Sequence, residues 1–115
     1  MVIGLLGYGT VGKGVYDILL EQPDFQVKYV LDLRDLPELG DKLVRDINVI
    51  LEDPEIDTVV ELIGGMNPAY EFVKASLLAG KNVVSANKLM ISLHYNELVT
   101  LAKEKHKIPL IGSRL

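Results

Sequence analysis

The sequence contains no cysteine among its 115 residues. This absence excludes a disulfide framework, a thiolate metal site and a cysteine nucleophile, and it is compatible with a reducing compartment. Redox chemistry in this chain would therefore need a bound cofactor. We expect a cytoplasmic location on the same ground.

The chain also lacks a basic cluster and a long apolar run. Sixteen acidic residues outnumber twelve basic ones, which gives a net charge of −4, and the basic residues are scattered. No apolar stretch approaches the roughly 18 residues that a membrane span requires. We therefore expect neither nucleic acid nor a membrane as a partner. The two histidines, His94 and His106, lack metal-ligand spacing, so no metal site is predicted.

What is present is the composition of one folded domain. Apolar residues make up 49% of the sequence and charged residues 24%, which is typical of a globular protein rather than a disordered one. A length of 115 residues matches a single domain that can bury an ordinary core. We therefore expect one domain over residues 1–115.

Short β-rich runs alternate with helical windows along the chain. Strands are expected at residues 1–6, 26–33, 58–63, 82–85 and 108–111, and helices at residues 11–22, 46–52, 68–79 and 93–106. In the third helix, Asn67 is expected as the N-cap residue, Pro68 as the first helical residue and Gly80 as the residue after the C-cap. This alternation predicts a doubly wound α/β domain with a parallel sheet, the Rossmann-type arrangement.

A glycine-rich motif joins the first strand to the first helix. Gly7-Tyr8-Gly9-Thr10-Val11-Gly12 fits G-x-G-x-x-G. In this context the first glycine allows a tight turn, the second lets the backbone approach a pyrophosphate, and the third permits close helix packing. Val11, Val15, Ile18 and Leu19 then share one helical face. Dinucleotide binding is the prediction, and a glycine turn without a ligand is the alternative.

Two charged residues at the end of the second strand bear on the choice of cofactor. Asp32 follows Gly12 by twenty residues, where a carboxylate would accept hydrogen bonds from the adenosine ribose of NAD. Arg34 lies at the same corner, where a guanidinium would pair with the 2′-phosphate of NADP. A solvated charge cluster with Asp35 is the alternative, and NAD and NADP both stay open.

The third and fourth strands end in segments that suit a ligand crevice. Glu61 interrupts the third strand just before Gly64 and Gly65, and in a doubly wound sheet this edge lies beside the nicotinamide half of the cofactor. Asn87 and Lys88 follow the fourth strand, where an amide and a cation would bind an anionic group or polarise a carbonyl. Turn chemistry and a surface lysine at a helix start are the alternatives.

Together, several motifs resemble homoserine dehydrogenase over nearly the whole chain. They are G-x-G-T-V-G-x-G at 7–14, Asp-Pro-Glu-Ile-Asp at 53–57, Val-Val-Glu-Leu-Ile-Gly-Gly at 59–65, Leu-Ala-Gly-Lys at 78–81 and Val-Val-Ser-Ala-Asn-Lys at 83–88. The order and spacing of the Glu-to-Gly-Gly and Ala-Asn-Lys segments are specific to the cofactor domain of that family. The region 33–47 is shorter than usual, and its Leu-Arg-Asp-Leu resembles a Val-Arg-Asp-Leu whose arginine is associated with the NADP phosphate.

The resemblance implies an enzyme that interconverts aspartate semialdehyde and homoserine with NAD or NADP, on the route to threonine and methionine. It assigns roles to the matching positions. Gly7, Gly9, Thr10, Val11 and Gly12 would hold the pyrophosphate, Gly64 and Gly65 would adjoin the nicotinamide ribose, and Lys88 would be the active-site lysine.

The family pattern extends further than this sequence. Members continue into a substrate and dimerisation domain with a catalytic Asp and Lys, whereas the sequence ends at Leu115. We therefore expect an isolated cofactor domain that is inactive alone. The amino-acid substrate would bind only with the further domain, and full-length members would be homo-oligomers. The alternatives are a stand-alone nucleotide-binding regulatory module and the first domain of an aspartate-type amino-acid dehydrogenase.

Overall fold

Strands and helices alternate along the chain in the computed structural model, which describes residues 1–64, 67–105 and 109–111. The strands are β1 (Val2–Leu6), β2 (Gln26–Leu31), β3 (Leu43–Val44), β4 (Thr58–Glu61), β5 (Asn82–Ser85) and β6 (Pro109–Ile111). The helices are α1 (Thr10–Leu20), α2 (Ile47–Leu51), α3 (Ala69–Leu78), α4 (Lys88–Leu93) and α5 (Tyr95–Glu104), with the 3-10 helix η1 (Pro37–Lys42) before β3.

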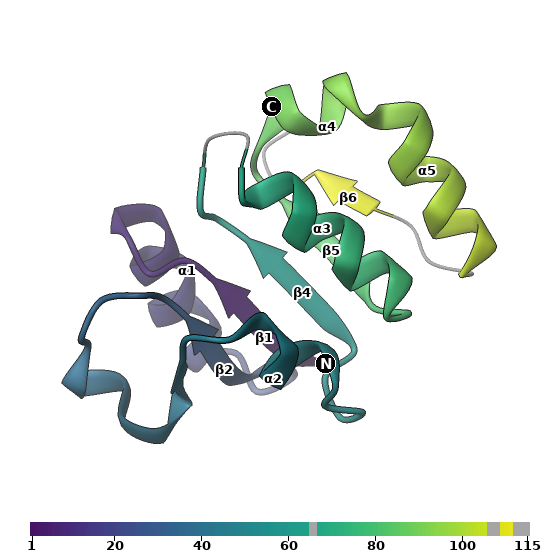
Figure 1. Cartoon of the computed structure of the whole chain (residues 1–115). Helices are drawn as coiled ribbons and strands as arrows, with labels where there is room; N and C mark the ends of the chain where they lie inside the picture. The colour runs from purple at the N-terminus through teal and green to yellow at the C-terminus, as the bar shows by residue number, and fades with distance from the viewer. Residues whose placement is uncertain (65–66, 106–108, 112–115) are drawn as a thin grey trace.

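The strands form one parallel sheet in the order β3-β2-β1-β4-β5-β6 (Figure 1). The chain first adds strands on one side of β1, then returns to its other side at β4. The order therefore reverses between β1 and β4, and at such a point the loops after the strands diverge and leave a crevice. This topology confirms the predicted doubly wound α/β domain.

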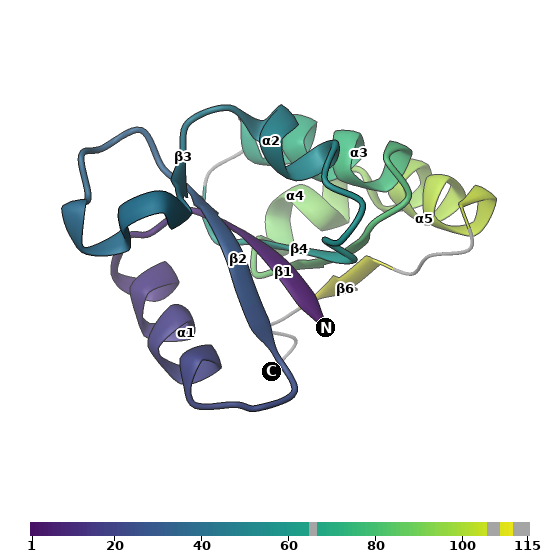
Figure 2. The ribbon, with the colours of Figure 1, turned by 90° about the horizontal axis from the view of Figure 1, so that it is seen from below.

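Helices cover both faces of the sheet because its strands carry apolar side chains on both sides. Figure 2 shows α1 on one face, and α2 and α3 on the other. Tyr16 of α1 and Leu39 of η1 belong to one core cluster with Leu5, Val30 and Val60. On the opposite face, Ile50 of α2 packs in a cluster with residues of β1, β2 and β4, and α3 packs with α4 and α5 around β5.

The buried face of α1 matches the expected one only in part. Leu19 packs against the core and Val15 is partly buried, but Val11 and Ile18 are 61% and 62% exposed. Gly12 and Tyr16 are the buried residues of the helix. A Cβ at Gly12 would lie only 2.1 Å from the carbonyl oxygen of Gly7. Because Gly12 lies so close to Gly7, this side of the helix faces the sheet. The spacing of the apolar residues alone does not decide which side is buried.

Other features also differ from expectation. Residues 37–44, for which no strand or helix was expected, form η1 and, at the sheet edge, β3, which pairs with β2. The helix expected over 93–106 begins at Tyr95 as α5, and α4 precedes it as a separate helix. Helix α3 begins at Ala69 with Pro68 as its N-cap residue, so Asn67 does not cap it. Gly80 follows the C-cap with φ +80, as expected.

Within residues 1–64, 67–105 and 109–111, no helix combines the length and the apolar character that crossing a membrane requires.

Candidate dinucleotide site

The predicted site residues gather at the carboxyl edge of the sheet. Gly7 and Gly9 follow β1, Asp32 and Arg34 follow β2, Gly64 follows β4, and Asn87 and Lys88 follow β5. Parallel strands place all these ends at one edge, on both sides of the point where the strand order reverses. Gly65 lies outside the residues that the structure describes.

The glycine loop has the geometry that its motif predicts. Gly7 has φ +98, a conformation that favours glycine, and its carbonyl lies directly beneath Gly12. A Cβ at Gly9, in contrast, would meet no protein atom within 4 Å. Gly9 is the N-cap residue of α1 and offers no side chain to the first turn, so the leading N–H groups of the helix face an open space. Such a cradle fits a pyrophosphate.

A pocket of about 450 Å³ opens beside this loop. Its walls come from residues 7–9, residues 31–34 and Arg45 on one side, and from residues 62–63, Pro68 and Phe72 on the other. The walls are mainly apolar, with the charged groups confined to Asp32, Arg34 and Arg45. A pocket with this mixture suits a flat heterocycle attached to a polar, anionic group.

Asp32 and Arg34 do not act as separate groups, because they bind one another. The Nε of Arg34 donates to Asp32 Oδ1 at 3.0 Å, and Nη2 donates to Oδ2 at 3.1 Å. The same Nη2 donates to the backbone carbonyl of Tyr8 at 2.6 Å. The backbone N–H groups of Tyr8 and Arg34 complete the set of donors to Asp32, at 3.0 and 2.9 Å. A carboxylate offers about four acceptor positions, so this network occupies all of them.

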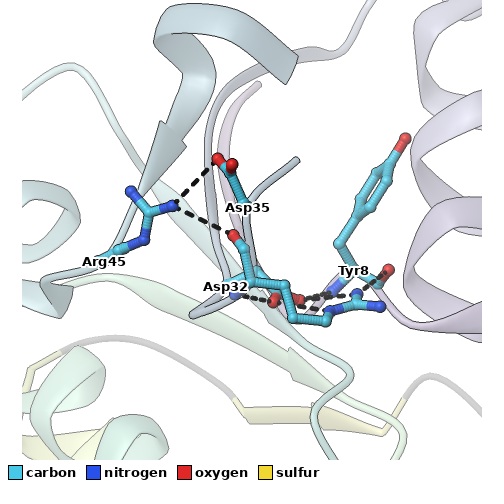
Figure 3. A network of polar contacts seen from close by, with 5 residues as sticks. Tyr8, Asp32, Asp35 and Arg45 are labelled. Atoms are coloured by element: carbon cyan, nitrogen blue, oxygen red, sulfur yellow. Dashed lines mark hydrogen bonds and ion pairs between the residues drawn. The ribbon is translucent and has the colours of Figure 1, made fainter. Parts of the chain in front are cut away.

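Arg45 is a residue of this corner that the sequence analysis did not identify. It follows β3, and its guanidinium donates to the carbonyl of Arg34 at 3.3 Å and pairs with Asp35 at 3.6 Å (Figure 3). Only the pairing of β3 with β2 brings it to the pocket. A basic residue after a two-residue edge strand gives no local signal in the sequence.

Asp32 should stabilise the fold in a pH-dependent way. Its hydrogen bonds from Arg34, and then those from the backbone, lower the pKa of the carboxyl from 3.8 to about 2. Because the folded pKa lies below the unfolded one, the stabilisation is fully present above about pH 4 and is lost as the pH falls through about 2. We expect Asp32→Asn to lower the free energy of unfolding by about 1 kcal/mol at neutral pH, a value reduced by solvent screening of the exposed Arg34.

Urea unfolding at a series of pH values measures this contribution. The difference between Asp32→Asn and the unaltered chain should shrink as the pH falls from about 4 toward about 2. Asp35→Asn is the matched control, since Asp35 is 95% exposed and should contribute much less. A difference that stays constant over this range would contradict the assignment.

A smaller pocket, of about 160 Å³, lies on the other side of the glycine loop. It is lined by Val11 from α1, by Glu61, Leu62 and Gly64 at the end of β4, and by Ala86 and Asn87 after β5. The two pockets therefore flank the loop that holds Gly9. An extended molecule with its anionic centre at this loop would reach into both.

Asn87 and Lys88 begin α4. The side chain of Asn87 accepts the N–H of Met90 at 3.1 Å, so it is the N-cap of this helix as well as part of the pocket wall. Lys88 is the first helical residue and is exposed. Thr10 is likewise exposed, at the first position of α1. The structure thus brings these residues to the edge that the sequence predicts, without assigning their roles.

Comparison with known proteins identifies the family. A family model described as the NAD binding domain of homoserine dehydrogenase matches residues 7–110. The homoserine dehydrogenases of Pseudomonas aeruginosa and Bacillus subtilis are 36% and 35% identical to this chain, over 90% and 89% of its length. The chain covers only 26% and 27% of theirs, about a quarter of each relative.

Solved structures agree with this match. The homoserine dehydrogenase of Thiobacillus denitrificans superposes with a TM-score of 0.85 at 34% identity, covering 96% of this chain and 29% of that one. The S. aureus enzyme at pH 6.5 superposes with a TM-score of 0.83 at 31% identity, covering 98% and 32%. This chain therefore belongs to the family of homoserine dehydrogenase NAD-binding domains, and its cofactor is a nicotinamide dinucleotide.

Proposed function

We propose that this chain is the cofactor-binding part of an oxidoreductase that interconverts L-homoserine and L-aspartate 4-semialdehyde. The observation that carries the proposal is the family match over residues 7–110, on a fold with two pockets that flank the glycine loop. The nicotinamide dinucleotide supplies hydride transfer when it is bound. The proposal includes a cytoplasmic location and a homo-oligomeric full-length enzyme, with residues 1–115 as its cofactor domain.

The pyrophosphate is assigned to the loop from Gly7 to Gly12. Backbone N–H groups of Thr10, Val11 and Gly12 begin α1 and carry the positive end of its dipole, which favours an anion. The open space at Gly9 supports this assignment because the phosphates must approach the backbone closely.

The nicotinamide half is assigned to the smaller pocket, with Gly64, Gly65 and Asn87 as its neighbours. The support for Gly64 and Asn87 is that both line this pocket, beside Val11. Lys88 follows Asn87 at the same edge and would face the amino-acid substrate, which binds only when a further domain covers this edge. A cation there would stabilise negative charge on the substrate oxygen as hydride moves.

The larger pocket, assigned to the adenosine half, favours NADP over NAD. Asp32 has no acceptor position left for ribose hydroxyls while Arg34 is bound to it. Arg34 uses its Nε and Nη2 hydrogens in this network, which leaves its Nη1 pair for a phosphate. Arg34 and Arg45 are also 57% and 53% exposed, and both line the pocket. Two accessible guanidinium groups suit a 2′-phosphate.

Calorimetric titration of the chain with NAD and with NADP tests the proposed function. We expect one saturable site per chain for at least one dinucleotide, with the higher affinity for NADP. Absence of binding by both would overturn the proposal. Tighter binding of NAD would overturn only the preference, and would restore Asp32 as the ribose acceptor.

Arg34→Ala tests the source of that preference. It should weaken NADP binding by about 1.5–3 kcal/mol, the scale of hydrogen bonds to a charged group, and should change NAD binding little. Lys42→Ala is the matched control, because it removes a nearby cation whose Nζ contacts Tyr16 and which does not line the pocket. Equal losses for the two dinucleotides, or none, would reject the role of Arg34.

A further inference from the structure

Glu61 is a fully buried charged residue at the end of β4, with 0% of its surface exposed. Burying a carboxylate is costly unless hydrogen bonds replace its water, and the preceding strand residues, Val59 and Val60, are apolar. A valine or leucine would complete the core equally well. The charge therefore needs an explanation in the contacts that it makes.

The carboxylate of Glu61 binds two segments at once. Its Oε2 accepts the backbone N–H groups of Ile63 at 2.7 Å and Gly64 at 3.3 Å, which belong to the loop after its own strand. Its Oε1 accepts the hydroxyl of Ser85 at 2.6 Å, from the paired position on β5. One charged group thus joins the ends of two neighbouring strands.

The connection continues from Ser85 to the start of α4. The Oγ of Ser85 accepts the backbone N–H of Asn87 at 3.1 Å, and the side chain of Asn87 in turn caps α4. Gly64, at the other end of this series of contacts, has φ +83. A sharp turn after β4 and the first residues after β5 are therefore held by the same buried group.

These two segments form two walls of the smaller pocket. Leu62 and Gly64 line it after β4, Ala86 and Asn87 line it after β5, and Glu61, whose carboxylate binds both segments, lines it as well. The hydrogen bonds of Glu61 therefore connect the two walls. A planar ring bound between them would be sensitive to their separation.

We infer that Glu61 is a positioning residue for the nicotinamide ring, acting through the two loops that its carboxylate joins. The inference rests on the proposed assignment of this pocket to the nicotinamide half. Glu61 does not contact the reacting atoms in this account. It sets the width of the pocket by accepting hydrogen bonds from one wall and, through Ser85, from the other.

Glu61→Gln tests the inference, because glutamine keeps the volume but replaces one acceptor oxygen with a donor amide. The readout compares two ligands that differ only by the nicotinamide ring: NADP with 2′-phospho-ADP-ribose, or NAD with ADP-ribose if NAD binds more tightly. We expect the affinity for the dinucleotide to fall about tenfold, the scale of a weakened charged hydrogen bond, while the affinity for the ring-less ligand is unchanged. A general loss of structure would instead lower the affinities for both ligands by the same factor.

Ser85→Ala provides a second test that leaves the carboxylate and its backbone bonds in place. It should weaken dinucleotide binding about threefold, again without affecting the ring-less ligand, because the bond from Ser85 to Glu61 and the acceptor for the Asn87 N–H are both lost from the β5 side of the pocket. Ser76→Ala is the matched control: Ser76 is also fully buried, but its hydroxyl donates to Phe72 within α3, and its loss should leave the ratio of the two affinities unchanged.

The outcomes separate this inference from the proposed function. An unaltered chain that binds no dinucleotide would overturn both. If the unaltered chain binds the dinucleotide, the readout is the ratio of the affinities for the dinucleotide and the ring-less ligand. A ratio that is the same in Glu61→Gln and Ser85→Ala as in the unaltered chain would overturn the positioning role alone. If Glu61→Gln fails to fold, the ratio of the two affinities in Ser85→Ala decides whether the positioning role holds.

Discussion

Replacing Gly9 with valine should lower the affinity for the dinucleotide by about a hundredfold or more, which corresponds to about 2.7 kcal/mol, and leave the fold intact. The backbone of Gly9, with φ −73 and ψ −162, is accessible to any residue, and its Cβ would meet no protein atom within 4 Å. The valine side chain would instead fill the space that the pyrophosphate needs. Titration calorimetry measures the loss, and thermal unfolding checks the fold.

Two other glycines of the same segment serve as comparisons. Gly14 also has open space at its Cβ, within α1, so Gly14→Ala should stabilise the helix by about 0.5–1 kcal/mol without affecting the dinucleotide. Gly12→Ala should destabilise the fold, because its Cβ would collide with the carbonyl of Gly7 at 2.1 Å. A Gly9→Val chain that binds as tightly as the unaltered one would show that the pyrophosphate lies elsewhere.

Loss of Lys88 should have the second large effect, on catalysis rather than on cofactor binding. Lys88 is exposed at the start of α4, so Lys88→Ala should change the stability of this chain little. Under the proposed function, joining this domain to the substrate domain of a homoserine dehydrogenase would remove water from this edge and strengthen the interaction of the ammonium with the substrate. We then expect kcat/KM for homoserine to fall by about a hundredfold or more, with cofactor affinity unchanged.

Steady-state kinetics of that two-domain enzyme is the measurement. Lys103→Ala, which removes an exposed lysine from the last turn of α5, is the control and should leave kcat/KM unchanged. Normal turnover by Lys88→Ala would make Lys88 an ordinary surface lysine at a helix start. If the unaltered two-domain protein binds the dinucleotide but does not turn over homoserine, a regulatory nucleotide-binding module would be favoured instead.

The pairing of Asp32 with Arg34 changes how the two residues bear on cofactor choice. Taken separately, the carboxylate favours NAD and the guanidinium favours NADP. In the folded chain they form one unit with the backbone of Tyr8, so a substitution of either alters the other. Affinities for both dinucleotides must therefore be compared in each variant before a preference is assigned to one side chain.

The sequence by itself determined the alternation of strands and helices, the parallel sheet and the edge at which the site forms. These features depend on local signals: apolar runs of strand length, the glycine motif between strand and helix, and the glycine after α3. The helix expected over 46–52 is present as α2, where Asp46 accepts the N–H of Asn48 as an N-cap. Local chemistry was sufficient in each of these cases.

Tertiary structure alone decided which side chains meet. The order of the strands brings Arg45 beside Arg34 and Ser85 beside Glu61, and neither contact has a signal in the intervening sequence. The buried side of α1 depends on the close approach of Gly12 to Gly7, which the glycine motif predicts, and on the packing of Tyr16 in the core, which the apolar spacing does not indicate. A periodic pattern determines which residues share a face, but the neighbour that covers this face is set by long-range packing.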